Sequence, residues 1–271
     1  MKNIIVIIPH YNNLEGLNKS LQSISDLTPV DVLIIDDGSK QDQKPSLKNL
    51  EVRYPNIHTI IYLDNTKNRG IEYVLNDGLK YAQEHAYTYI ARLDCGDICH
   101  PDRFKLQKEF LDNHPDIYLV GSWVSFVDMQ GKEIFQFRPK TNQQEIEKKM
   151  YFSNQFAHPA VMFRTKSIGK IGNYSLNKKA AEDYDYFFRF VINFSTANIP
   201  KILLIYELNP NGISSKNRKQ QIKSRIYVIV DNFRHNRIQA VGGLLYNILI
   251  YMAPYNFTRL IKRILKKVKN D

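Results

Sequence analysis

Short apolar runs alternate with amphipathic helical patterns through the first half of this 271-residue chain, and this alternation constrains the fold more than any other feature. The runs are rich in Ile and Val and read NIIVIIP, VDVLIID, HTIIYL and YTYIARL. After the first run, apolar side chains recur at the spacing of one helix face, at Leu14, Leu17, Leu21 and Ile24. Strands that alternate with helices predict a parallel, doubly wound α/β sheet.

The second half of the chain predicts further elements on the same sheet, in mixed orientation. We expect a helix near 141–150, strands at PAVMFR and KILLIYEL, and a helix that begins near residue 181. The segment NPNGISSKNRK contains turn-forming residues and marks a boundary. We therefore divide the chain into residues 1–212, which hold the sheet, and residues 213–271, a basic C-terminal region that we expect to be helical.

The net charge of +11 has its whole excess in the C-terminal region. Residues 1–215 carry 25 basic and 25 acidic side chains, whereas residues 216–271 carry 13 basic and 2 acidic ones. A neutral body with a basic end indicates two surfaces with different partners. Nucleic acid is one candidate partner, but the sequence has no helix-turn-helix, RNP or zinc-finger signature to support it.

Polar residues follow three of the predicted strands, at the points where those strands end. The sequences are PHYNN after the first strand, DDGS after the second and DCGD after the fourth. Ligands of open α/β sheets bind outside the carboxyl ends of the strands, so these side chains should meet in one crevice. Asn, Asp and Gly also form ordinary turns and caps, and Asn12 and Glu15 have the spacing of a capping box. Three such groups together favour a binding site.

The motifs that are missing narrow the class of ligand. Neither G-x-G-x-x-G after the first strand nor a G-x-x-x-x-G-K-[ST] phosphate loop occurs in the sequence. Carboxylates alone would repel a phosphorylated ligand, whereas Mg²⁺ or Mn²⁺ between carboxylate and phosphate oxygens removes that conflict. We therefore expect a nucleotide diphosphate held through metal, with Asp36 and Asp37 available to accept hydrogen bonds from the base or the ribose.

Five segments in a fixed order and spacing give the chain a family resemblance. VIIPHYN, LIIDDGS, NRGIEYVLNDGL, ARLDCGDICHPDRF and AEDYDYFFR together resemble glycosyltransferase family 2 on a GT-A fold, over about residues 3–210. The resemblance implies an inverting enzyme that moves a sugar from a UDP- or dTDP-sugar to a saccharide acceptor, in synthesis of a bacterial capsule, O-antigen or lipooligosaccharide. It implies a nucleotide-sugar site formed by Pro9, Tyr11, Asn12, Asp36, Asp37, Arg69 and Asp94.

The metal-binding segment departs from the family pattern at one position. Many members read Asp-Ala-Asp-Asp where this chain has Asp94, Cys95, Gly96 and Asp97, so glycine replaces a carboxylate. Either Asp97 binds Mg²⁺ or Mn²⁺ together with water and phosphate oxygens, with Asp94 in the same metal region, or metal dependence is weakened. We expect the first, because Mg²⁺ commonly keeps several waters.

The two cysteines of the chain, Cys95 and Cys99, lie in this segment beside His100. All three are zinc-ligand types, but a second Cys/His pair for a structural zinc site is not evident. We expect the cysteines to be packing residues. Two cysteines in a chain of this length also argue against a disulfide framework and for a reducing compartment.

An inverting transfer requires a base that takes the proton of the acceptor hydroxyl. Glu182, Asp183 and Asp185 lie at the start of a predicted helix, where acids also match the helix dipole. The family pattern places the base in this Glu-Asp pair, and we expect Asp183 to be the base and Glu182 to orient it or to contact the acceptor. His158 is a candidate contact for the acceptor or the diphosphate, with a hydrogen-bonded turn histidine as the alternative.

The final predicted helix has an apolar face and a basic face. The apolar side chains are Leu260, Ile261, Ile264, Leu265 and Val268, and the basic ones are Arg259, Lys262, Arg263, Lys266 and Lys267. This pattern is typical of a helix that lies on an anionic membrane. The preceding segment AVGGLLYNILIYMAPYNF is apolar, but it is too short and interrupted for a predicted span.

These features predict where the protein acts. The first apolar run is interrupted by Pro9 and His10 and is expected to be a strand rather than an export signal. We therefore expect a cytoplasmic enzyme attached peripherally to the inner face of the cell membrane, with a lipid-linked acceptor and no nucleic-acid partner. A nucleic-acid-binding protein with a basic arm, or a nucleotidyltransferase with similar carboxylates, are the alternatives.

Overall fold

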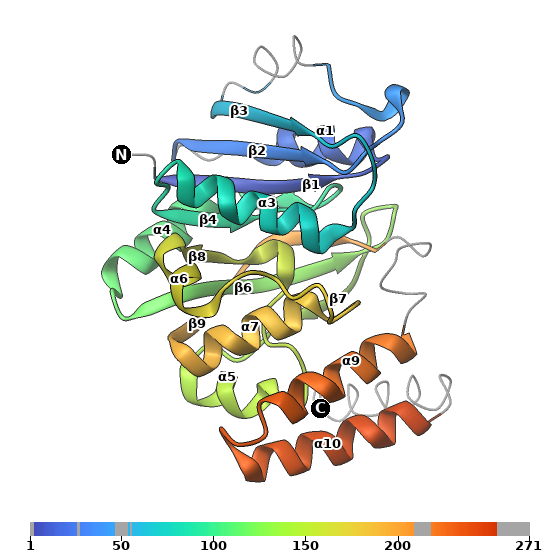
Figure 1. Ribbon diagram of the computed structural model, residues 1–271. Helices are drawn as coiled ribbons and strands as arrows, with labels where there is room; N and C mark the ends of the chain where they lie inside the picture. The colour runs from blue at the N-terminus through green and yellow to red at the C-terminus, as the bar shows by residue number, and fades with distance from the viewer. Residues whose placement is uncertain (1–2, 26–27, 47–53, 55, 209–217, 254–271) are drawn as a thin grey trace.

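The computed structural model describes residues 3–25, 28–46, 54, 56–208 and 218–253 (Figure 1). In this part of the chain, nine strands form one mixed sheet in the order β3-β2-β1-β4-β8-β6-β9-β5, with β7 paired to β6. The strands are β1 (Ile4–His10), β2 (Val30–Asp36), β3 (Ile57–Asp64), β4 (Tyr89–Arg92), β5 (Ile98–Cys99), β6 (Ile117–Val127), β7 (Glu133–Phe137), β8 (Met162–Arg164) and β9 (Ser195–Glu207).

Strands β3, β2, β1 and β4 are parallel, and the second half of the sheet adds antiparallel pairs through β8, β5 and β7. β6 and β9 pair in parallel. In β1, Ile5 and Ile7 point into one core, whereas Val6 and Ile8 point into the other. A strand buried on both faces reads as a continuous apolar run, which is why NIIVIIP lacks alternation.

Helices cover both faces of the sheet. The helices are α1 (Leu14–Ser23), α3 (Ile71–Glu84), α4 (Arg103–Asn113), α5 (Gln143–Met150), α6 (Ile168–Ile171), α7 (Glu182–Asn193), α9 (Arg218–Asp231) and α10 (Arg237–Met252). The core on one face contains apolar residues of α1 and α4, and the core on the other contains residues of α3, α5, α6, α7 and α9. The mixed, mainly parallel sheet with flanking helices that the sequence predicts is confirmed.

The predicted cap of the first helix is wrong by one residue. Asn13, and not Asn12, is the N-cap of α1, and its side-chain oxygen accepts a hydrogen bond from the Gly16 amide at 3.1 Å. Asn12 adopts a positive φ of 49° and uses its side chain on a different loop. The sequence has two adjacent asparagines, and only the turn between β1 and α1 decides which of them caps the helix.

Helices α9 and α10 pack on the body of the molecule (Figure 1). Val228 and Ile229 of α9 are fully buried in the same core as α7, and Ala240 of α10 is buried there too. The boundary at residues 212 and 213 stays a prediction. The amphipathic pattern of residues 259–268 lies outside the described residues, and within the described ones no helix is long and apolar enough to cross a bilayer.

Candidate active site

The loops after β1 and β2 are tied together at the carboxyl edge of the parallel strands. The Asn12 amide donates to Ser39 Oγ at 2.8 Å, and the Lys40 amide donates to Asn12 Oδ1 at the same distance. Pro9 lies on the adjoining segment, where its carbonyl accepts a hydrogen bond from Cys95 Sγ of the loop after β4, at 3.1 Å. The three polar segments that the sequence predicts to meet are therefore in one place, because parallel neighbouring strands end at one edge.

Asp36, the last residue of β2, is fully buried. Its Oδ1 accepts a hydrogen bond from the Ser39 amide at 2.6 Å, and its Oδ2 lies 3.5 Å from His10 Nε2. The buried imidazole in turn contacts the Gln43 carbonyl at 2.8 Å. Asp36 thus holds the turn after β2 in place from beneath.

Asp37 organises the segment before α3. Its two carboxylate oxygens accept hydrogen bonds from the backbone amides of Arg69, at 2.8 Å, and Gly70, at 2.9 Å. The Arg69 side chain pairs with Asp77 and lies 5.7 Å from the ring centroid of Tyr73. The two hydrogen bonds to Asp37 hold Arg69 at the edge of the sheet where β2 ends. Tyr11, by contrast, has 51% of its surface exposed, so its ring is available to a ligand.

A chain of hydrogen bonds links Asp94 to His158 through a fully buried arginine. Arg92 donates from Nη2 to Asp94 Oδ1 at 2.7 Å, from Nη1 to the Ile7 carbonyl at 2.6 Å and from Nε to His158 Nε2 at 3.4 Å. His158 Nε2 also lies 3.0 Å from the Tyr174 hydroxyl. Burial, followed by the Arg92 charge, holds the pKa of His158 well below its usual range, so the imidazole is neutral.

Asp97 lies in the loop between β4 and β5 and is only 3% exposed. Burial, and then the charge of Asp94, raise the pKa of Asp97 well above its usual range, although a backbone hydrogen bond from Glu207 opposes the shift. Its Oδ2 has no hydrogen-bond partner among the described residues. Burial thus favours the protonated form of Asp97, and a cation close to the carboxylate would oppose that effect.

The metal that the family resemblance implies was tested against the side chains present. The described residues hold no group of three or more His, Cys, Asp or Glu side chains placed to bind an ion. Asp94 is 37% exposed at its side chain, Asp97 Oδ2 is unpartnered, and a Cβ on Gly96 would meet no atom within 4 Å. This donor set fits a hard cation that takes most of its ligands from phosphate and water rather than from protein.

Glu182 and Asp183 form the first turn of α7. Asp183 Oδ2 accepts a hydrogen bond from Asn154 Nδ2 at 3.0 Å. Burial, and then the Asp183 charge, raise the pKa of Glu182 to about 8. Burial also raises the pKa of Asp183, against the opposing effects of Tyr184, Arg225 and Asn154. The Asp94 charge contributes to both shifts, which places the end of β4 and the start of α7 at one site.

Four residues near the candidate site have contacts that could not be predicted from the sequence. Tyr174 is 2% exposed and holds the loop before α7 against α3, where its backbone amide and carbonyl bond the Asn76 side chain at 2.8 and 3.0 Å. Asn154 and Arg225 reach Asp183 from separate elements. Arg92 is fully buried, and its guanidinium donates a hydrogen bond to Asp94. No local sequence signal marks these residues, because their positions depend on distant segments.

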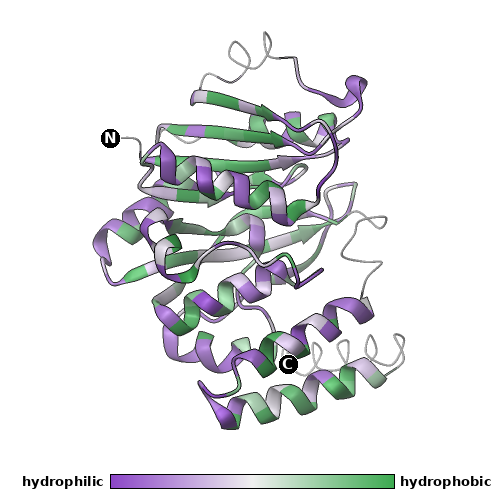
Figure 2. Ribbon diagram, in the orientation of Figure 1, coloured by the Kyte–Doolittle hydropathy of each residue, from purple (hydrophilic) through white to green (hydrophobic). Residues whose placement is uncertain are grey.

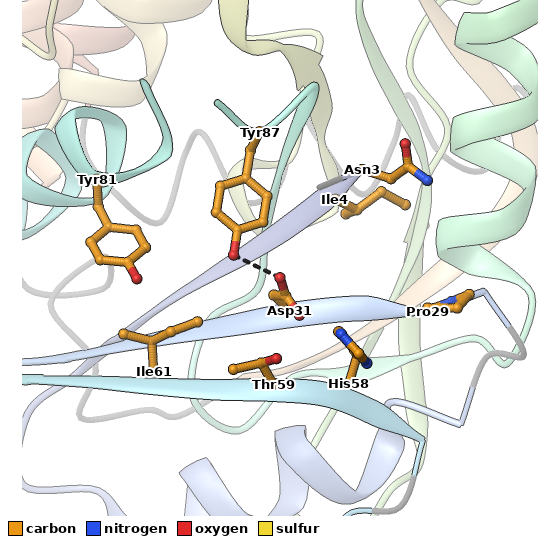
Figure 3. Close-up of a pocket in the computed structure, with 9 residues that line it drawn as sticks. All are labelled: Asn3, Ile4, Pro29, Asp31, His58, Thr59, Ile61, Tyr81 and Tyr87. Carbon is orange, nitrogen blue, oxygen red and sulfur yellow. Dashed lines mark hydrogen bonds between the residues drawn. The ribbon is translucent and has the colours of Figure 1, made fainter. Parts of the chain in front are cut away.

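A cavity of about 520 Å³ lies at the opposite, amino ends of β1, β2 and β3 (Figure 3). Its lining includes Asp31, which accepts a hydrogen bond from the Tyr87 hydroxyl at 2.7 Å, and Tyr81 of α3. None of the lining residues is a predicted site residue. The predicted site carboxylates therefore lie away from this cavity, at the carboxyl edge of the sheet.

Comparisons with known proteins show which family this chain resembles. The family model described as "Glycosyl transferase family 2" matches residues 5–172. The chain is 27% identical over 253 residues to the amylovoran biosynthesis glycosyltransferase AmsE of Erwinia amylovora, a match that covers 92% of each chain. It is 28% identical over 248 residues to an Escherichia coli UDP-Gal:alpha-D-GlcNAc-diphosphoundecaprenol beta-1,3-galactosyltransferase, over 90% of this chain and 78% of that protein.

A solved structure shares the fold. The mannosyltransferase PcManGT from Pyrobaculum calidifontis, determined in complex with GDP-Man and Mn²⁺, superposes with a TM-score of 0.64 at 13% identity, over 97% of this chain and 79% of that one. The likeness confirms the predicted GT-A architecture. Because the family model covers more than half of the 271 residues, this chain belongs to glycosyl transferase family 2 and is a glycosyltransferase.

Proposed function

We propose that the enzyme transfers a sugar, with inversion, from a UDP- or dTDP-sugar to a saccharide acceptor in the synthesis of a cell-surface polysaccharide. The observation that carries the proposal is that Glu182 and Asp183, at the start of α7, lie close enough to Asp94 for its charge to raise the pKa of both. The names of two relatives support it, since one is an amylovoran biosynthesis glycosyltransferase and the other uses UDP-Gal.

The nucleotide would bind along the loops after β1 and β2. Tyr11 offers an exposed ring for packing against the base, and Asn12 and Pro9 shape the loop beneath it. Asp37 already accepts two backbone hydrogen bonds, so it acts on the nucleotide by fixing the segment at Arg69 as well as through any bond of its own. Asp36 supports the turn from inside the sheet.

A divalent cation, Mg²⁺ or Mn²⁺, would be held by Asp94 and Asp97 together with diphosphate oxygens. When bound, such a cation neutralises the negative charge on the departing nucleoside diphosphate. Arg92 fixes the direction of the Asp94 carboxylate by its bond at 2.7 Å. His158 takes part through Arg92 and Tyr174, and as a neutral imidazole it would offer a hydrogen bond to the diphosphate or the acceptor rather than a charge.

Asp183 would act as the base that removes the proton of the acceptor hydroxyl. A base is most effective when its pKa lies near the working pH, and burial moves the pKa of Asp183 in that direction. The Asn154 side chain donates to Asp183 Oδ2 at 3.0 Å and the Tyr184 amide donates to Oδ1 at 2.7 Å, so both carboxylate oxygens are held in place. Each oxygen keeps a second lone pair that could accept the proton of the acceptor hydroxyl. Glu182, with its pKa raised to about 8, is partly protonated at neutral pH and can donate a hydrogen bond to the acceptor.

The acceptor would be lipid-linked, and the enzyme would lie on the inner face of the cell membrane. The supports are the diphosphoundecaprenol acceptor in the name of one relative and the basic, amphipathic sequence of residues 259–268. An acceptor confined to a membrane favours an enzyme that is held there as well.

The test incubates the enzyme with a set of UDP- and dTDP-sugars, Mg²⁺ or Mn²⁺, and lipid-diphosphate saccharide acceptors. Release of nucleoside diphosphate together with an extended lipid saccharide supports the proposal, and NMR of the product determines whether the anomeric configuration is inverted. Consumption or release of pyrophosphate would support a nucleotidyltransferase instead. Retention of configuration would refute the inverting mechanism while leaving sugar transfer intact.

A further inference from the structure

Helix α10 contains many hydrophobic residues (Figure 2), and several of them are exposed. Ile238, Leu245, Leu249 and Met252 are 82%, 59%, 67% and 76% exposed. The exposed apolar face of α10 consists of Ile238, Val241, Leu245, Ile248, Leu249 and Met252. These side chains recur at helical spacing and form one continuous stripe, and a contiguous apolar stripe on a soluble surface marks an interaction site.

The opposite face of α10 fixes the direction in which this stripe points. Asn247 is fully buried, and its side-chain amide donates to the carbonyls of Tyr151, at 3.4 Å, and Gly243, at 2.8 Å. A Cβ on Gly243 would lie 2.3 Å from the Tyr151 carbonyl oxygen, so the backbone of α10 packs too closely on the body of the protein for a larger residue at this position. The helix therefore cannot rotate to hide its apolar stripe without losing these contacts.

The surrounding charge is positive. The sequence of α10 contains no acidic residue, and the exposed Arg234 and Arg237 lie at its start. The 18 residues that follow α10 and its C-cap, from residue 254 onward, carry six Lys or Arg side chains and one Asp. An anionic surface would neutralise this charge, whereas a symmetric dimer through the stripe would bring two positively charged segments together.

The length of α10 decides how it would meet a bilayer. Its 16 residues span about 24 Å at 1.5 Å per residue, which is shorter than the hydrocarbon core of roughly 30 Å. A helix of this length with one apolar face lies in the interface rather than across it. Tyr246 and Tyr251, each about 40% exposed, suit the boundary between acyl chains and headgroups.

We propose that the exposed apolar face of α10 is a membrane-docking surface that inserts into the headgroup region of an anionic bilayer. The proposal assigns insertion to folded residues of the described structure, in addition to any contribution of residues 259–268. If the proposed function is also correct, docking orients the catalytic helix, because α9 lies between α10 and α7 (Figure 1). Two helix layers would place Asp183 on the order of 20 Å above the membrane, within reach of a sugar on a lipid diphosphate.

Vesicle binding of the full chain tests the proposal without any donor or acceptor, so the result is independent of the transfer reaction. Sucrose-loaded vesicles of phosphatidylcholine with 0 or about 30% phosphatidylglycerol are sedimented with wild-type protein and with Leu245→Glu/Leu249→Glu. We expect binding to anionic vesicles that the double substitution weakens by about tenfold or more. A matched control, Met129→Glu/Ile134→Glu, changes two exposed apolar side chains on the β6–β7 hairpin and should bind as the wild type does.

A second variant locates the contact. Leu249→Trp should show a blue-shifted emission on vesicle binding and quenching by brominated acyl chains, above the constant signal of Trp123. Equal vesicle binding by Leu245→Glu/Leu249→Glu and wild type would overturn the proposal, because residues 259–268 would then suffice. A wild-type dimer in sedimentation equilibrium that the same double substitution dissociates, without vesicle binding, would assign the face to a second copy of the chain instead.

Discussion

The fully buried Arg92 donates a hydrogen bond from Nη2 to Asp94 Oδ1, at 2.7 Å, at the edge of the candidate active site. The same guanidinium also bonds the Ile7 carbonyl and His158, so its direction is fixed by the sheet. The position of the Asp94 carboxylate is therefore set by a fully buried side chain. If Asp94 acts at the donor site as proposed, Arg92 is a positioning residue for that site.

Replacing Arg92 should weaken donor binding more than the loss of another buried arginine does. We expect Arg92→Met to lower the affinity for the nucleotide sugar by roughly 10- to 100-fold, because Asp94 loses its orientation. Isothermal titration with the donor measures this. The control is Arg164→Met, which removes a second buried arginine that bonds the Leu111 and Ile117 carbonyls. Equal donor affinity in both variants would contradict the role of Arg92.

Removing the proposed base should abolish turnover and spare donor binding. We expect Asp183→Asn to reduce kcat by at least about 10²-fold, since loss of a general base typically costs 10² to 10⁴. Glu182→Gln should have a smaller effect on kcat and raise the acceptor KM. Near-normal turnover of Asp183→Asn would refute the assignment of the base.

The pH dependence of the reaction should report the environment of Asp183. A base with a raised pKa loses activity as the pH falls through that pKa, so the acid limb of kcat/KM should lie above pH 4, the ordinary range of an aspartate. Asn154→Ala removes a hydrogen bond that favours the charged form, and the acid limb should move to higher pH by about one unit. Asn193→Ala, at the far end of α7, should leave the profile unchanged. An unshifted limb in Asn154→Ala would show that Asp183 is not the titrating group.

Asp97 should make the metal-free protein less stable as the pH rises. Its pKa is raised in the folded state, so its stabilising contribution is complete below the unfolded pKa and is lost as the pH rises through the folded pKa. In EDTA, as the pH rises from 5 to 8, the free energy of unfolding of the wild type should fall relative to that of Asp97→Asn by on the order of 1 kcal/mol or more. Identical pH slopes of wild type and variant in chemical denaturation would contradict this.

Metal titration distinguishes the two roles of Asp97. If Asp97 helps to hold Mg²⁺ or Mn²⁺, the stabilisation of the wild type by metal with nucleoside diphosphate should be reduced in Asp97→Asn, since a ligand that binds only the folded state raises its stability. An unchanged metal titration would leave Asp97 with the structural role alone.

The contact between α10 and the body should be sensitive to one methyl group. Gly243→Ala places a Cβ 2.3 Å from the Tyr151 carbonyl oxygen, and we expect a loss of about 1–3 kcal/mol despite the better helix propensity of alanine. Gly169→Ala in α6 is the control, because a Cβ there meets no atom within 4 Å. Thermal denaturation compares them. A neutral Gly243→Ala would show that α10 is loosely attached.

The alternating strands and helices could be predicted from the sequence, because continuous apolar runs such as NIIVIIP and the helical spacing of apolar residues from Leu14 to Ile24 are local signals. The family could be predicted as well, and so could the placement of Asp36, Asp37 and Asp94 at strand ends, since parallel strands that are neighbours must end at one edge. The helix cap shows the limit of such signals, because Asn12 and Asn13 look alike until the turn is built.

The contacts of those side chains could not be predicted, because they depend on how distant segments pack together. Arg92 is a polar residue of a strand in the sequence. Its bond to His158 arises because β4 lies beside the segment that starts at residue 158, and its bond to the Ile7 carbonyl arises because β4 pairs with β1. The burial of Asp97 and the approach of Asn154 to Asp183 likewise depend on segments tens of residues away. The pKa and the orientation of a carboxylate depend on side chains from several segments that surround it. A local sequence pattern does not show which side chains those are.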